Sequence, residues 1–129
     1  ETGIEEIFKM QKQEANKNFC KFVEDNYIKF LPYDNAAAPI MSHALMRRGI
    51  LTEQQAGKPF FFFLLDNLRF DQWRTISPII SEYFKVEKED MYLSILPTST
   101  QYCCNAIFAG LMPSDIEKRF PGKWSNDED

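Results

Sequence analysis

Residues 60–65 read Phe-Phe-Phe-Phe-Leu-Leu, and this apolar run stops abruptly at Asp66. Successive side chains of a strand point to opposite faces, so a run that is apolar at both parities predicts a strand covered on both sides. Such strands are typical of parallel sheets that are flanked by helices. The run is far too short to cross a bilayer, and we expect no membrane insertion.

The segment after this run is predicted to be helical and to lead to a second strand. Apolar residues recur there at helical spacing, namely Phe70, Trp73, Ile76, Ile80, Tyr83 and Phe84. Pro78 interrupts the pattern, and Ser77–Pro78 is predicted to open a second helical piece. Residues 91–96 form the second candidate strand. Two strands joined by a crossover helix predict a parallel pair and an α/β fold.

Two further helices are predicted near the C-terminal end. The first runs from Thr100 or Gln101 through Ala109 and is closed by Gly110. The second begins at Ser114, three residues before Glu117 in the spacing of a capping box, and ends before Pro121.

The N-terminal part reads as a helical region over residues 1–57. Thr2 and Glu5 have capping-box spacing, and a long amphipathic helix is predicted from Gly3 to Leu31. Its apolar positions are Ile4, Phe8, Ala15, Phe19, Phe22, Val23, Tyr27 and Phe30. A shorter helix is predicted from Pro39 to Arg48, followed by a polar connection.

Residues 58–129 are predicted to be the opening of an α/β domain. Two strands do not suffice for an α/β core, because both faces of the apolar run need cover. We therefore expect the chain to be part of a longer protein, in which a helical linker precedes an incomplete strand-helix-strand-helix unit.

Composition excludes several classes of function. The net charge is -4 at pH 7 and no basic run is present, so nucleic-acid binding through a phosphate-neutralising patch is not indicated. Cys20, Cys103 and Cys104 lack the spacing of a zinc motif, and His43 is the only histidine. With reduced thiols and no signal-peptide pattern, the cytoplasm is the expected location.

Polar residues stand where a parallel sheet would place a functional site, at the carboxyl ends of the two strands. Asp66 ends the first strand, and Thr98, Ser99 and Thr100 follow the second. A carboxylate can hold a metal that activates a hydroxyl, and a helix start binds phosphate oxygens, so a phosphoryl-transfer half-site is one interpretation. The alternative is structural, because Ser and Thr are preferred helix caps and Asp is a turn former.

The motifs DNLRFD at 66–71, PTSTQY at 97–102 and NAIFAGLMP at 105–113 resemble the PglZ branch of the alkaline phosphatase superfamily. They are more closely similar to the PorX-like response regulators of type IX secretion, as are MQKQEANKNFCKFVEDNY and APIMSH upstream. The resemblance implies a zinc-dependent phosphatase or phosphodiesterase with two metal ions. It makes Asp66 a metal ligand and Thr100 both the nucleophile and a ligand. Asn105 and Arg69 become candidates for phosphate binding, although Arg69 could equally be a solvated charge.

Two positions depart from the family pattern. Cys103 stands where related phosphodiesterases carry an asparagine that binds the phosphoryl oxygen, and Cys104 stands where PorX-like chains carry arginine. The resemblance implies a phosphate-ester or nucleotide-type substrate, with the remaining ligands later in the protein, so the segment alone is expected to be inactive. The alternative is a non-catalytic module that docks a secretion-motor protein or a sigma factor. The long N-terminal helix is a candidate for homodimer contacts.

Overall fold

The computed structural model describes residues 2–52 and 57–124. The chain divides into two compact units, Glu1–Pro39 and Ile40–Asp129. This division differs from the domain boundary that we predict between residues 57 and 58, which rests on the sequence pattern and stays a prediction.

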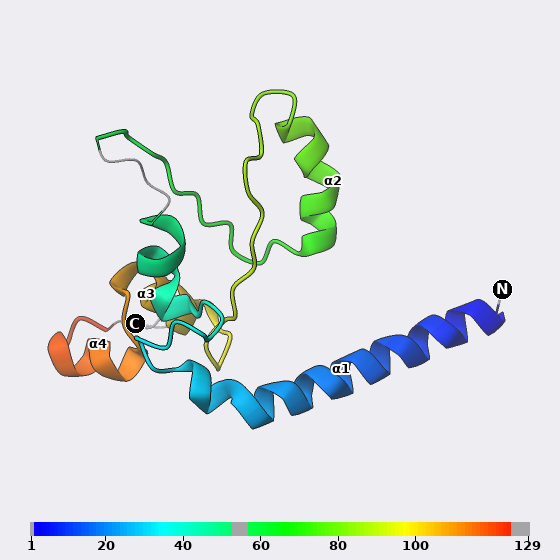
Figure 1. Ribbon diagram of the computed structural model, residues 1–129, viewed down its shortest axis with the longest axis horizontal. Coiled ribbons are helices and arrows are strands. Elements are labelled where there is room, and N and C mark those ends of the chain that lie inside the picture. The colour runs from blue at the N-terminus through cyan, green and yellow to red at the C-terminus, as the bar shows by residue number, and fades with distance from the viewer. Residues whose placement is uncertain (1, 53–56, 125–129) are drawn as a thin grey trace. The chain divides into compact units, whose positions relative to one another are not determined.

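The first unit consists of the helix α1, which runs from Thr2 to Phe30, and the turn that follows it. Figure 1 shows α1 as one continuous helix. The amide of Asn35 donates to the carbonyl oxygen of Lys29 over 2.9 Å and satisfies an acceptor that the helix end would leave open. The helix predicted from Gly3 to Leu31 is thus confirmed to within one residue. The side chain of Thr2, and with it the predicted capping box, lies outside the described residues.

The apolar side chains of α1 are exposed within this unit, among them Ile4, Phe8, Phe19 and Phe22. Two aromatic contacts run along the helix: the rings of Phe19 and Phe22 are 6.2 Å apart, and those of Phe22 and Phe30 are 5.8 Å apart. Among the residues that the structure describes, no helix has the length and apolar composition needed to cross a membrane.

The second unit opens with an extended stretch and two short helices. Ser42 N–H donates to the carbonyl of Leu93, and Leu93 N–H donates to that of Ile40, which makes a parallel bridge between Met41 and Leu93. A 3₁₀ helix, η1, follows over Ser42–Ala44, and a π-helix, η2, over Leu45–Ile50. The helix predicted from Pro39 is therefore wrong at its start, because residues 40–42 use their backbone groups to pair with Leu93.

The helices α3 (Thr100–Ala109) and α4 (Pro113–Arg119) complete the packed part of this unit. The chain turns after α3 at Gly110, whose φ of 64° lies in the left-handed region that glycine adopts without strain. Both the extent of α3 and its closure by Gly110 are confirmed. The buried apolar side chains of this region are Met41, Ala44, Ile95, Cys103, Ala106, Ile107 and Ile116.

The start of α4 differs from the prediction. Asp115 and Ile116 donate their N–H groups to the carbonyl of Met112, so the helix begins with Pro113 in its first position. Ser114 then lies inside the first turn, and the capping box predicted there is wrong. Proline is favoured at this first position because its missing N–H would have no partner in the helix. The helix ends at Arg119, before Pro121, as predicted.

The helix α2 runs from Phe70 to Ile80 and contains Pro78. The prediction that Ser77–Pro78 opens a second helical piece is wrong. A proline inside a helix removes one backbone hydrogen bond, and here the loss falls in the last turn, where fewer bonds depend on it. The N–H of Ser81 still donates to the carbonyl of Ser77 over 2.9 Å.

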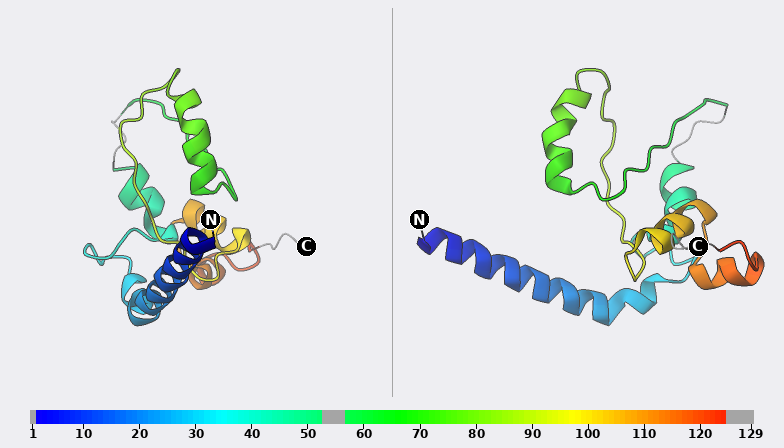
Figure 2. Two further views of the ribbon diagram at one scale, coloured as in Figure 1. Left: turned by 90° about the vertical axis from the view of Figure 1, so that its right-hand side faces the viewer. Right: turned by 180° about the vertical axis from the view of Figure 1, so that it is seen from behind.

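The two predicted strands are not formed as such. Residues 58–65 are extended without a ladder, and in the second segment only Leu93 makes a bridge, to Met41. The two segments lead into and out of α2 as extended traces (Figure 2). A strand needs a neighbour for its backbone groups, and neither segment provides it for the other. The run at 60–65 is accordingly covered on one face only. Phe61 is 86% and Phe63 79% exposed, whereas Phe62 and Leu64 are half-buried and the ring of Phe62 packs against that of Phe108.

Candidate functional site

Asp66 lies in a tight turn directly after the extended run. Its Oδ1 accepts the backbone N–H of Asn67 over 3.0 Å. Asn67 has a φ of 57°, in the left-handed region that asparagine tolerates better than most residues. The interpretation of Asp66 as a turn former is therefore supported, but it accounts for only one of the two carboxylate oxygens.

Thr100 is the first residue of α3, and Ser99 precedes it as the N-cap. Ser99 has extended backbone angles, but its side chain does not form a capping hydrogen bond. Its carbonyl accepts the N–H groups of Tyr102 and Cys103. Capping therefore does not explain why a hydroxyl stands at Thr100.

The hydroxyl of Thr100 donates to Oδ2 of Asp66 over 2.9 Å, although the two residues are 34 positions apart. Both side chains are exposed, so a ligand can reach them. One carboxylate thus serves the turn with one oxygen and holds the threonine hydroxyl with the other. A hydroxyl held in this way has its lone pairs directed outward, and the carboxylate can accept its proton.

Arg69 contacts Asp71 rather than this pair. Its Nε and Nη2 each donate to one carboxylate oxygen of Asp71 over 2.9 Å, and both side chains are 68% exposed. The hydrogen bond with Asp71 raises the pKa of Arg69, and the same bond lowers the pKa of Asp71. The structure therefore does not bring Arg69 to Asp66 and Thr100.

Two other residues singled out in the sequence lie away from the pair. The amide of Asn105 donates to the carbonyl of Gln101 within α3, over 2.7 Å. Asn105 follows Thr100 by five residues, which turns it by about 140° around the helix axis. His43 lies buried on η1, in the packed part of the unit.

The described residues contain no group of three or more His, Cys, Asp or Glu side chains that would hold a metal ion. Asp66 and Thr100 contribute two oxygen donors, a donor type that suits divalent cations. Catalytic zinc sites ordinarily have three protein ligands, so the pair could supply only part of the ligand set of a metal site.

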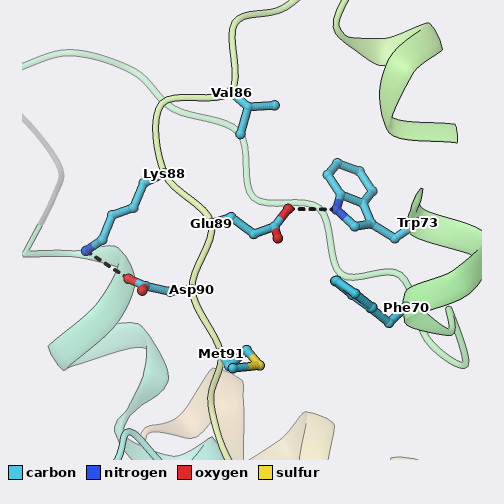
Figure 3. Close-up of a pocket in the computed structure, with 7 residues that line it drawn as sticks. All are labelled: Phe70, Trp73, Val86, Lys88, Glu89, Asp90 and Met91. Carbon is cyan, nitrogen blue, oxygen red and sulfur yellow. Dashed lines mark hydrogen bonds and ion pairs between the residues drawn. The ribbon is translucent and has the colours of Figure 1, made fainter. Parts of the chain in front are cut away.

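A separate open pocket of about 570 Å³ lies between α2 and residues 86–91. Figure 3 shows the rings of Phe70 and Trp73 on one side and the extended segment on the other. The indole N–H of Trp73 donates to Oε2 of Glu89 over 3.1 Å, and Lys88 pairs with Asp90 over 2.9 Å. The sequence reasoning missed this pocket, because neither residue pattern nor spacing links Trp73 to Glu89.

Comparison with protein families gives two matches. Residues 1–31 match the PorX response regulator linker domain, and residues 46–128 match the BREX system PglZ alkaline phosphatase-like domain. A comparison with curated proteins finds no match for this chain. The two matches together relate the chain to the PorX-like response regulators, and the second implies an α/β fold within a generally metal-dependent superfamily. Because that second match covers more than half of the residues, the chain belongs to the PglZ alkaline phosphatase-like domain family.

Proposed function

We propose that this chain supplies the nucleophile of a metal-dependent phosphatase or phosphodiesterase, with Thr100 as the attacking residue and Asp66 as its partner. The single observation that carries the proposal is the 2.9 Å hydrogen bond between the Thr100 hydroxyl and the Asp66 carboxylate. It joins the end of one extended segment to the start of α3, which is the placement that family membership leads us to expect for these two roles.

The reaction would proceed in two displacements. Oγ1 of Thr100 attacks the phosphorus of a phosphate ester, the bond to the leaving oxygen breaks, and the hydroxyl proton of Thr100 passes through Asp66 to that oxygen, which departs as an alcohol. The first N–H groups of α3, which have no partner within the helix, would bind a phosphoryl oxygen. Water then attacks the phosphothreonine, the bond between phosphorus and Oγ1 breaks, and one proton of the water passes to Oγ1 as inorganic phosphate or a monoester leaves.

Asp66 and Thr100 would also hold the metal. Zinc, as two ions in the family, would neutralise charge on the phosphoryl oxygens and make the threonine hydroxyl easier to deprotonate. Since the described residues give only two ligands, we propose that the activity requires a longer protein and that this segment alone is inactive. Asn105 and Arg69 remain proposed phosphate contacts. Arg69 would have to leave Asp71 to reach a substrate.

A second proposal concerns the helical unit. The exposed apolar side chains of α1 form a surface against which another helix can pack. A homodimer through this helix, or docking of a secretion-motor protein or a sigma factor in the cytoplasm, would use that surface and need no catalysis. Under this alternative the Asp66–Thr100 site would have no catalytic role, and the chain would belong to a signalling module of type IX secretion.

The test compares four versions of the longer protein that contains this segment: wild type, Thr100→Val, Asp66→Ala and Thr98→Val. Thr98 is an exposed hydroxyl two residues earlier and provides the matched control. We expect Thr100→Val to slow hydrolysis of a chromogenic phosphodiester by about 100-fold or more, as for loss of a nucleophile or general base, while Thr98→Val retains wild-type rates. Asp66→Ala should lower both the rate and the zinc content. Equal rates in all variants would overturn the enzymatic proposal.

A further inference from the structure

The buried thiol of Cys103 lies one helical turn after Thr100. Its side chain points into the packed part of the unit, and the residue is 8% exposed. The sulfur is 3.6 Å from the carbonyl oxygen of Ile95 and 3.8 Å from that of Pro97, both within the reach of a thiol hydrogen bond. These two carbonyls belong to the segment that leads into α3, so the thiol ties the helix back to its own approach.

The segment that receives these contacts is itself firmly held. Ile95 is 0% exposed, and its N–H donates to Oγ of Ser42 over 3.2 Å. Two residues earlier, Leu93 forms the parallel bridge to Met41. A contact from α3 to the carbonyl of Ile95 is therefore a contact to a backbone segment that is itself held in place.

The thiol keeps its proton at neutral pH. Burial raises the pKa of Cys103 above its ordinary value, and the negative charge of Asp66 adds to the rise, while hydrogen bonds with Ser94 and Ser42 offset part of it. A protonated thiol has one S–H to donate, which it can give to the carbonyl oxygen of Ile95 or share with that of Pro97.

The first turn of α3 has a particular need for such a tie. Its N-cap, Ser99, makes no side-chain capping bond, and a helix without that bond is less stable at its first turn. Fraying of this turn would carry Thr100 away from Asp66, since Thr100 is the first helical residue. Residues three apart lie on the same side of a helix, so a clamp at Cys103 acts on the turn that Thr100 opens.

We propose that Cys103 is a positioning residue, whose thiol clamps the first turn of α3 to the carbonyls of Ile95 and Pro97 and thereby keeps the Thr100 hydroxyl aimed at Asp66. The catalytic meaning of this clamp rests on the proposed function, whereas its geometric effect does not. In this chain the residue three positions after the nucleophile serves the helix and not the phosphoryl group.

The experiment measures the side-chain rotamer of Thr100 in the isotopically labelled full chain, through three-bond couplings from its methyl carbon to the backbone nitrogen and carbonyl. We expect a single dominant rotamer in the wild type and rotamer-averaged couplings in Cys103→Ala. Cys103→Ser, which keeps a donor, should restore the single rotamer. Ile107→Val removes buried volume from the same helix without removing a donor, and should leave the couplings of Thr100 unchanged.

Three results would overturn the clamp: unaveraged couplings in a folded Cys103→Ala, failure of Cys103→Ser to restore them, or equal averaging in Ile107→Val. If Cys103→Ala does not fold, Cys103→Val keeps the volume, lacks the donor, and is expected to show the same averaging. The couplings do not depend on turnover. A Thr100→Val enzyme with wild-type hydrolysis would therefore remove the proposed function and leave this result standing.

Discussion

The second unit contains two regions that differ in how far their apolar side chains are buried. Around α3 and η1 the apolar side chains are buried, with Ile107 1% and Ile95 0% exposed. Around α2 and its flanking extended segments many of them face solvent, and Met91 is 93% exposed. In the first region the backbone groups form hydrogen bonds within helices and across the Met41–Leu93 bridge. In the second region the two extended segments do not pair with each other, so their backbone groups lack strand partners.

The difference shows which parts of the fold local forces can build. Helices satisfy their own backbone groups, so α3 and η1 bury a small core once they meet. The exposed phenylalanines of an extended run contribute no hydrophobic stabilisation until another element removes them from water. The Asp66–Thr100 contact lies at the junction of the two regions, and it joins the end of the exposed run to the start of the packed helix.

The largest expected effect separates the two regions directly. Ile107→Ala should lower the free energy of unfolding by about 3 kcal/mol, because it opens a cavity in the packed region. Phe61→Ala, in the exposed run, should change it by less than about 0.5 kcal/mol. Urea unfolding of the two variants gives both values, and comparable losses would contradict the contrast between the regions.

Gly110→Ala should cost about 1 kcal/mol. The nearest atom to an added Cβ is the carbonyl oxygen of His43 at 3.9 Å, so space is available and the cost comes from the left-handed backbone. Gly110→Asn is the matched control, because asparagine tolerates this conformation and should lose less. Thermal unfolding of the two variants provides the comparison, and an equal loss in both would point to a steric cause instead.

In the exposed region, Trp73→Phe removes the donor to Glu89 and should cost about 0.5 kcal/mol, since an exposed hydrogen bond contributes little. The expected local effect is larger: faster amide exchange over residues 86–91, which this bond ties to α2. Glu89→Gln keeps an acceptor oxygen and should leave the exchange rates close to the wild type. Unchanged exchange in Trp73→Phe would show that the bond does not hold the segment.

The smallest effect concerns pH. Because the hydrogen bond with Arg69 lowers the pKa of Asp71 in the folded chain, the pair stabilises the start of α2 above the unfolded pKa of the carboxyl. This contribution disappears as the pH falls through the lower, folded pKa. The chemical shifts of the first turn of α2 should follow this titration in the wild type and not in Asp71→Asn. High salt should weaken the effect, as for any exposed pair.

The sequence predicted those elements whose signals are local. The extents of α1 and α3 and the Gly110 closure follow from helical spacing and from the αL preference of glycine. The strands at 60–65 and 91–96 were predicted from apolarity alone, and apolarity does not supply a partner. The start of η1 was missed because the bridge from Met41 to Leu93 joins residues that are 52 positions apart, and the Trp73–Glu89 contact was missed for the same kind of reason.

For the candidate site, the sequence predicts that Asp66 and Thr100 each follow an apolar extended segment and come close together, and the structure joins their side chains by a hydrogen bond. Their roles as metal ligand and nucleophile stay proposals. The orientation of Cys103 was not predictable, because a cysteine on a helix gives no sign of which carbonyls it will face.

The central claim is that the Thr100 and Asp66 side chains meet, and nuclear Overhauser effects in the labelled full chain test it most directly. The account predicts cross-peaks between the β-protons of Asp66 and the β- or methyl protons of Thr100, and their loss when Cys103→Ala frees the first turn of α3. The absence of these cross-peaks in a folded wild-type chain, with the cross-peaks of the α3–η1 core present, would contradict it.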